Sequence, residues 1–159
     1  IGFRESLLAG ALLSALRSFV IPRNLGLVSG ADGMMRLFSG LVRIPDVSFV
    51  SWERIPGKRV PAEPVPMLAT DIAIEVKSEG NTDEELRRKR GEYLGAGVRL
   101  VWETDADRRT VTAYTPEGGV EDSIDVMTED GTLDGGDMLP GFSLYLKDLF
   151  AELDRRSHS

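Results

Sequence analysis

The sequence predicts an α/β (α+β) fold in which helices flank a mixed β-sheet. The 159 residues are 42% hydrophobic and 28% charged, an ordinary composition for a globular chain with one core. Segment 3–20 has helical periodicity, and segments 71–78, 83–97 and 98–105 read as strand, helix and strand. That succession is typical of a βαβ crossover, which joins parallel neighbours in a sheet. We therefore expect a single domain that spans residues 1–159.

The first half of the chain is predicted to contain one helix and several strands. Apolar residues at three- and four-residue intervals make 3–20 an amphipathic helix with one face on the core. Short apolar runs at 25–30, 33–40 and 41–52 are separated by glycines, which indicates strands joined by tight turns in a meander. Three prolines within 60–67 predict an extended surface loop, because proline cannot donate to a ladder.

The second half is predicted to alternate strands and helices. The expected elements are strands at 71–78, 98–105 and 110–118, a helix at 83–97, and a short strand before a final helix from about Leu146. Thr82 and Glu85 form a capping box that opens the helix, and Gly95 and Gly97 end it. The acidic segment 130–137 fails the spacing of a calcium-binding EF-hand loop, so we expect a turn there.

The residue types present exclude several kinds of site. The chain has no cysteine, which removes disulfides, thiolate nucleophiles and cysteine-ligated zinc and makes the cytoplasm the default location. The single histidine, His158, lies in a polar tail, which argues against a Ser-His-Asp triad. Only about ten apolar residues separate Glu5 from Arg17, too few to cross a bilayer, and no signal-peptide cleavage site follows, so no membrane association is expected.

The charge distribution bears on nucleic-acid binding. The net charge of −7 argues against a general electrostatic attraction to nucleic acid. Basic residues nevertheless gather on the predicted helix at Arg87, Arg88, Lys89 and Arg90. We take these four as candidate contacts to DNA, although a run of this kind is more often a solvated helix face.

Charged residues on two predicted strands form a candidate site. Successive side chains of a strand point to opposite faces, so Glu75 and Lys77 share a face while Ile74 and Val76 point the other way. Asp46 faces the same side if its strand is the neighbour. Two carboxylates on adjacent strands suit a hard cation such as Mg²⁺ or Mn²⁺. A nearby lysine can orient the attacking water and offset charge on a phosphate, which is the chemistry of phosphodiester cleavage.

The order of motifs along the chain resembles a known nuclease family. Pro45 and Asp46 followed by Glu75, Val76 and Lys77 resemble the PD-(D/E)XK superfamily. Within it, the chain resembles the Uma-type restriction endonuclease family from about Leu25 to Phe150. The segments that carry this resemblance are VRIPDVSFVS, DIAIEVKSEGN, YLGAGVRLVWETD, TVTAY and DMLPGFSLYLKDLF.

The resemblance implies a restriction-endonuclease-like core, DNA as substrate, a divalent cation held by Asp46 and Glu75, and Lys77 as the catalytic lysine. It makes Glu5 the candidate for a glutamate that the superfamily often places on its first helix. Members of the family often carry the lysine on the following helix instead, where Lys89 stands; we favour Lys77 because it shares a strand face with Glu75. Cutting both strands of a duplex with one site per chain implies a homodimer.

Two functions remain open from the sequence. An intact set of Asp46, Glu75 and Lys77 favours a metal-dependent DNA endonuclease. The net charge of −7 favours the alternative, a non-catalytic nuclease-fold module for nucleic-acid binding or assembly. Tyr93 either approaches the site or packs the helix on the sheet, and we favour packing. We expect Asp71 to be the first exposed residue of its strand rather than a third ligand.

Overall fold

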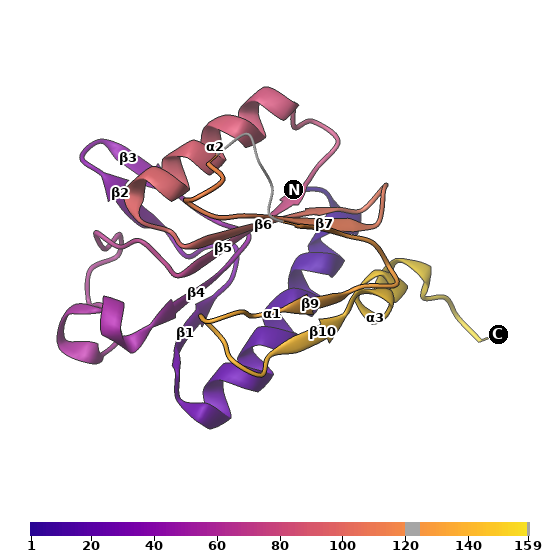
Figure 1. Cartoon of the computed structure of the whole chain (residues 1–159), viewed down its shortest axis with the longest axis horizontal. Coiled ribbons are helices and arrows are strands. Elements are labelled where there is room, and N and C mark those ends of the chain that lie inside the picture. The colour runs from indigo at the N-terminus through magenta and orange to yellow at the C-terminus, as the bar shows by residue number, and fades with distance from the viewer. Residues whose placement is uncertain (120–124, 159) are drawn as a thin grey trace.

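A mixed β-sheet with helices on both faces forms the centre of the molecule (Figure 1). The structure, a computed structural model, describes residues 1–119 and 125–158. Six strands are arranged in the order β1-β4-β5-β6-β7-β8, and only β5 and β6 run parallel. They are β1 (Gly26–Ser29), β4 (Val47–Ser51), β5 (Ile72–Lys77), β6 (Leu100–Asp105), β7 (Thr110–Tyr114) and β8 (Asp125–Met127). This arrangement confirms the predicted fold class.

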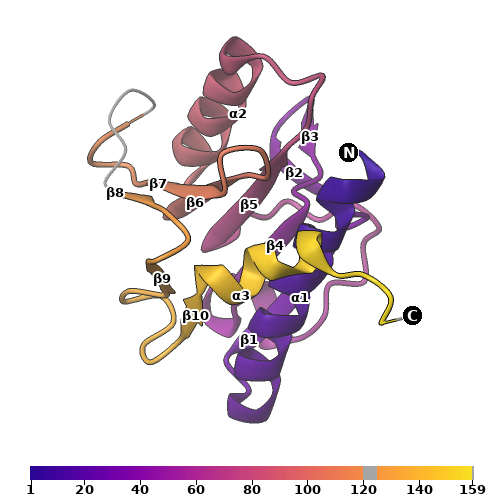
Figure 2. The same ribbon diagram turned by 90° about the vertical axis from the view of Figure 1, so that its right-hand side faces the viewer.

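The two faces of the sheet are covered by different helices (Figure 2). Helix α1 (Phe3–Arg23) packs with α3 (Leu146–Phe150) on the face that carries Ile72 and Ile74. Helix α2 (Asp83–Ala96) covers the opposite face, where Tyr93 packs with Ala73 and Val101. By length and composition α1 is the one helix of the described residues that could cross a membrane; here its buried face lies on the sheet.

Local sequence signals account for the bounds of α2. The hydroxyl of Thr82 accepts a hydrogen bond from the backbone N–H of Glu85 at 3.1 Å, which caps the first turn as predicted. Gly97 ends the helix with φ of 108°, a left-handed conformation that favours glycine. The helix therefore starts and stops where the sequence predicts, and this fixes which of its residues face the sheet.

The predicted meander at 25–52 is wrong. β1 pairs with β4, and the two strands between them, β2 (Met35–Phe38) and β3 (Leu41–Arg43), form a separate hairpin. This hairpin lies on the α2 side, where Met35 and Leu37 join the apolar cluster beneath the helix. It is held there by hydrogen bonds between Arg36 and the loop at Pro66 and Leu68.

The C-terminal part adds a second small sheet. The predicted turn at 130–137 contains β9 (Thr132–Asp134), which pairs with β10 (Ser143–Tyr145), so that expectation was wrong for this strand. The buried Leu133 explains the pairing, because it joins the core beneath the main sheet. The remaining helical elements of the described residues are short 3₁₀ turns, two after β4 and one after α3: Trp52–Arg54, Pro56–Lys58 and Ala151–Asp154.

Candidate active site

Asp46 and Glu75 face each other across β4 and β5. The two strands are antiparallel with Val47 opposite Ile74, so Asp46, just before β4, lies opposite Glu75. Both side chains are almost buried, with 8% and 6% of each residue exposed. The backbone N–H of Val76 donates to Oδ2 of Asp46 at 2.7 Å, which holds the aspartate against β5. The structure thus brings together the two carboxylates that strand alternation places on one face.

The pKa values of both carboxyl groups are raised above their ordinary values. Burial and, to a smaller extent, the nearby charge of Asp46 raise the pKa of Glu75 to about 7, against the hydrogen bond from Tyr93. Burial also raises the pKa of Asp46, although the Val76 N–H and the charge of Lys89 oppose the shift. A site that holds two carboxylates close together in a dry environment is one where a bound cation would be stabilised.

The donor set fits Mg²⁺ or Mn²⁺. These cations take oxygen ligands, and Mg²⁺ is commonly bound through one or two carboxylates while it keeps several waters. Across residues 1–119 and 125–158 no cluster of three or more Asp, Glu, His or Cys side chains could hold a metal. The pair formed by Asp46 and Glu75 would therefore leave coordination positions for water or a phosphate oxygen.

Lys89 lies with the carboxylates, and Lys77 does not. Asp46, Glu75 and Lys89 line a cavity of about 300 Å³, closed on one side by the loop between β5 and α2 at Ser78 and Asn81. The charge of Lys89 also lowers the pKa of both carboxyl groups. Lys77 shares the strand face of Glu75 as expected from alternation, but it is not among the residues that line this cavity.

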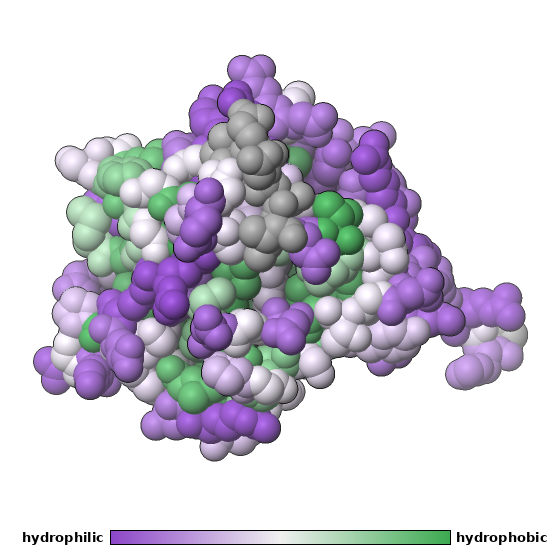
Figure 3. Space-filling model, viewed as in Figure 1, coloured by the Kyte–Doolittle hydropathy of each residue, from purple (hydrophilic) through white to green (hydrophobic). Residues whose placement is uncertain are grey.

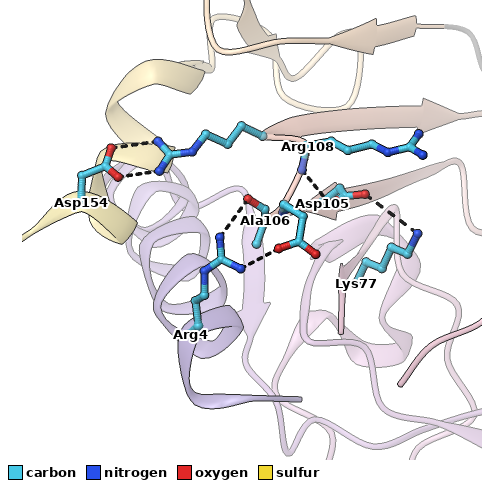
Figure 4. A network of polar contacts seen from close by, with 8 residues as sticks. Arg4, Lys77, Asp105, Ala106, Arg108 and Asp154 are labelled. Atoms are coloured by element: carbon cyan, nitrogen blue, oxygen red, sulfur yellow. Dashed lines mark hydrogen bonds and ion pairs between the residues drawn. The ribbon is translucent and has the colours of Figure 1, made fainter. Parts of the chain in front are cut away.

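Lys77 belongs to a network around the β6–β7 turn (Figure 4). Its Nζ lies 3.6 Å from Oδ1 of Asp83 and 3.9 Å from Oδ2 of Asp105. It lines a neighbouring cavity of about 290 Å³ together with Arg90 and Glu103, rather than the one that contains Asp46 and Glu75. The expected position of Lys77 beside the carboxylate pair is therefore not the one found.

Tyr93 contacts the site directly. Its hydroxyl donates to Oε1 of Glu75 at 2.6 Å, and the residue is fully buried. Burial and the charge of Glu75 raise the pKa of Tyr93, so the phenol keeps its proton and donates. We favoured a packing role over an approach to the site, and Tyr93 does both, since it also packs within the cluster beneath α2. The signal in the sequence was its spacing four residues after Lys89, which places both side chains on one helix face.

Comparison with known proteins gives the family of the chain. The model of the Uma2 family, described as "Putative restriction endonuclease", matches residues 2–147. The chain belongs to this family. The Uma2 match covers all three elements that form the site, namely β4, β5 and α2.

A solved structure has the same fold as this Uma2 chain. It is described as a putative nuclease belonging to DUF820 from Anabaena variabilis, with a TM-score of 0.82 and 23% sequence identity. The likeness covers 96% of this chain and 83% of the other. No curated protein matches the chain significantly. The family and the fold together support a nuclease, the reading that the sequence motifs favour.

The remaining candidate residues of the Uma2 chain lie around this centre. Glu5 is in the first turn of α1, half-buried, and is not among the residues that line the cavity of Asp46 and Glu75. Arg87 and Arg88 are exposed on α2. The surface at the top of the view, where α2 lies in Figure 1, is mainly hydrophilic (Figure 3).

Arg90 and Asp71 are buried instead of exposed. The Nε of Arg90 lies 3.1 Å from Oε2 of Glu103, and its guanidinium stacks over Tyr114 at 4.2 Å. Arg90 therefore joins α2 to the sheet and does not share the exposed face of its neighbours. The carboxylate of Asp71 accepts from the N–H of Ser51 at 2.6 Å and pairs with Arg54, so the expectation of an exposed Asp71 was wrong.

Proposed function

We propose that this protein is a metal-dependent DNA endonuclease in which Asp46 and Glu75 hold Mg²⁺ or Mn²⁺. The observation that supports this most is that the buried carboxylates of Asp46 and Glu75 line the same cavity as Lys89. The Uma2 family and the nuclease fold supply the class of reaction. The substrate is taken to be DNA because the family is described as a restriction endonuclease.

The reaction is hydrolysis of a phosphodiester. The oxygen of a water molecule bonds to phosphorus, the bond from phosphorus to one sugar oxygen breaks, and that oxygen takes up a proton while the water loses one. A divalent cation at this place would supply an acidified water and neutralise charge on the phosphate. Asp46 and Glu75 would bind and orient it through their carboxylate oxygens. The almost complete burial of these two residues limits the access of bulk water.

Lys89 is the lysine that we propose for catalysis. Its ammonium shares the cavity with the carboxylates and is placed to offset negative charge that develops on a phosphate oxygen or to orient the attacking water. Lys77, which we favoured from the sequence, stays the second candidate. Its ammonium is within 4.0 Å of two other acids, which compete with a phosphate for its charge.

The exposed face of α2 is proposed to contact the DNA backbone. Arg87 and Arg88 stand on the helix that carries Lys89, so they are placed to bind phosphates beside the scissile one. The net charge of −7 restricts such contacts to this local surface. Two copies of the chain would be needed to cut both strands of a duplex, and a symmetric homodimer is the commonest arrangement that provides them.

Cleavage assays test the proposal. The parent should nick supercoiled plasmid or cut short single strands with Mn²⁺, and Asp46→Asn and Glu75→Gln should abolish both cleavage and Mn²⁺ binding. Lys89→Ala should keep the metal and reduce cleavage by about 10²- to 10³-fold, the usual loss when one stabilising donor is removed. Lys77→Ala is the competing variant, because it removes the same charge from the neighbouring cavity and so tests the second candidate lysine.

Two outcomes would change the assignment. If Lys77→Ala loses cleavage and Lys89→Ala keeps it, the catalytic role belongs to Lys77. If the parent binds Mn²⁺ and DNA but nicks no substrate, the protein is a non-catalytic nuclease-fold module.

A further inference from the structure

The hydroxyl of Tyr93, on α2, forms a short hydrogen bond with a carboxylate of the candidate site. Tyr93 is fully buried in the apolar cluster formed with Met35, Ala73 and Val101. A buried hydroxyl needs a partner, and a backbone carbonyl would satisfy it as well as any side chain. Its acceptor is instead Oε1 of Glu75, at 2.6 Å. The hydrogen bond therefore joins the core of the helix–sheet interface to the candidate metal site.

Each of the two carboxylates accepts one hydrogen bond from outside the pair, and the two side chains also interact with each other. Oδ2 of Asp46 accepts from the N–H of Val76 at 2.7 Å, and Oε1 of Glu75 accepts from Tyr93 at 2.6 Å. Neither bond uses the second oxygen of its carboxylate. A glutamate has one more rotatable bond than an aspartate, so Glu75 has more need of an anchor if its second oxygen is to meet Asp46.

One face of helix α2 carries two residues of the candidate site, Lys89 and Tyr93. Lys89 and Tyr93 are four residues apart, so both side chains project toward the sheet. The first lines the cavity with the carboxylates, and the second binds one of them. The docking of a single rigid helix thus sets the distance between the lysine and the carboxylate pair.

We propose that Tyr93 is a positioning residue, which holds Glu75 in the orientation that binds a divalent cation together with Asp46. Partners of this kind behind a metal ligand orient it, and their loss typically weakens metal binding by about 10- to 100-fold. This inference rests on the proposed metal site. The new element is that the metal affinity of this site depends on the hydroxyl of Tyr93, which does not contact the metal.

Tyr93→Phe removes the hydroxyl and keeps the ring that packs under α2. Titration calorimetry of Mn²⁺ into the metal-free protein should show binding weaker than that of the parent by about 10- to 100-fold. Tyr145→Phe is the matched control, because it deletes a hydroxyl from an exposed tyrosine on β10, outside the site, and should bind Mn²⁺ as the parent does. Thermal melts of all three proteins establish that they are folded.

The possible results separate this inference from the proposed function. A parent that takes up no Mn²⁺ overturns the metal site and the role of Tyr93 with it. A parent that binds Mn²⁺, with Tyr93→Phe of equal affinity, overturns the role of Tyr93 alone and leaves a hydroxyl that only satisfies its burial.

A second measurement uses the intact chain and does not depend on the folding of a variant. The sequence has three tyrosines, so incorporation of 3-fluorotyrosine gives three ¹⁹F resonances, which Tyr114→Phe and Tyr145→Phe assign. Saturation with Mg²⁺ should shift the resonance of Tyr93, because the oxygen that accepts its hydrogen bond belongs to a metal ligand. A Tyr93 resonance that stays in place while Mg²⁺ binds would overturn the inference.

Discussion

The buried pair of carboxylates should make the metal-free protein less stable as the pH rises. The pKa of Glu75 is raised from its ordinary 4.5 to about 7, so the folded protein holds this proton more tightly than the unfolded chain does. A group of this kind contributes stability that is fully present below pH 4.5 and is lost as the pH rises through about 7. Glu75→Gln removes the titration and keeps an oxygen that can accept from Tyr93.

The size of the effect follows from the shift. Each pH unit of difference between folded and unfolded pKa corresponds to 1.36 kcal/mol, so a rise from 4.5 to about 7 gives about 3 kcal/mol. We compare the free energy of unfolding of Glu75→Gln with that of the parent. The difference, variant minus parent, should be about 3 kcal/mol larger at pH 8 than at pH 4.5. For a chain of this length that corresponds to about 6–12 °C in melting temperature.

The assay is urea unfolding of both proteins in EDTA, at intervals from pH 4.5 to pH 8. Subtraction of the two stability curves cancels the shared titrating groups that do not interact with Glu75. Asp46 and Glu103, whose charges raise the pKa of Glu75, still contribute to the difference. Glu84→Gln, which deletes an exposed carboxylate from α2, controls for the loss of one surface charge. Parallel curves for the parent and Glu75→Gln would refute the reasoning, because Glu75 would then titrate alike in both states.

Three further predictions concern the metal and the fold. Mn²⁺ at 100 times its dissociation constant should stabilise the parent by about 2.7 kcal/mol, which raises its melting temperature, and should leave the melting temperature of Asp46→Asn unchanged. An equal rise in melting temperature for both proteins would mean that the ion binds elsewhere. Arg54→Ala removes the closest ion-pair partner of the buried Asp71 and should cost about 1–3 kcal/mol in urea unfolding, whereas no loss would mean that the other partners suffice. Gly135→Ala puts a methyl group 2.5 Å from a backbone oxygen and should lower the free energy of unfolding by about 1–3 kcal/mol. Gly10→Ala, on α1 with nothing within 4 Å of the added methyl group, should raise it by about 0.5–1 kcal/mol. Melting temperatures that change in the same direction in both variants would contradict this.

Local signals in the sequence were enough for the parts of the fold that depend on a few consecutive residues. The bounds of α2 follow from Thr82 and Gly97, because capping and a left-handed glycine act within one turn. Strand alternation likewise placed Asp46 and Glu75 on one face, since the period of two holds along any strand and the two strands are neighbours. The class of fold follows from the order of these elements.

The rest depends on contacts between distant residues. β1 pairs with β4, and the β2–β3 hairpin that lies between them in the sequence is excluded from the main sheet. This pairing depends on Met35 and Leu37 of the hairpin, because they pack in the apolar cluster beneath α2. The two lysines show the same limit. Alternation gives the face on which Lys77 stands, but a long side chain also needs a direction, and Asp83 and Asp105 set that direction only once the strands and helix are assembled.

The position of Lys89 shows how the site depends on the assembled fold. Asp46 lies just before β4 and Glu75 lies within β5, while the lysine and the tyrosine come from helix α2. Two buried acids destabilise the folded chain when no cation is present, and a divalent cation bound only by the folded chain would reverse that cost. Metal affinity and folding stability should therefore be linked at this site. A substitution that relieves the repulsion, such as Glu75→Gln, should stabilise the protein and remove its activity, as expected where a functional site is kept at the expense of stability.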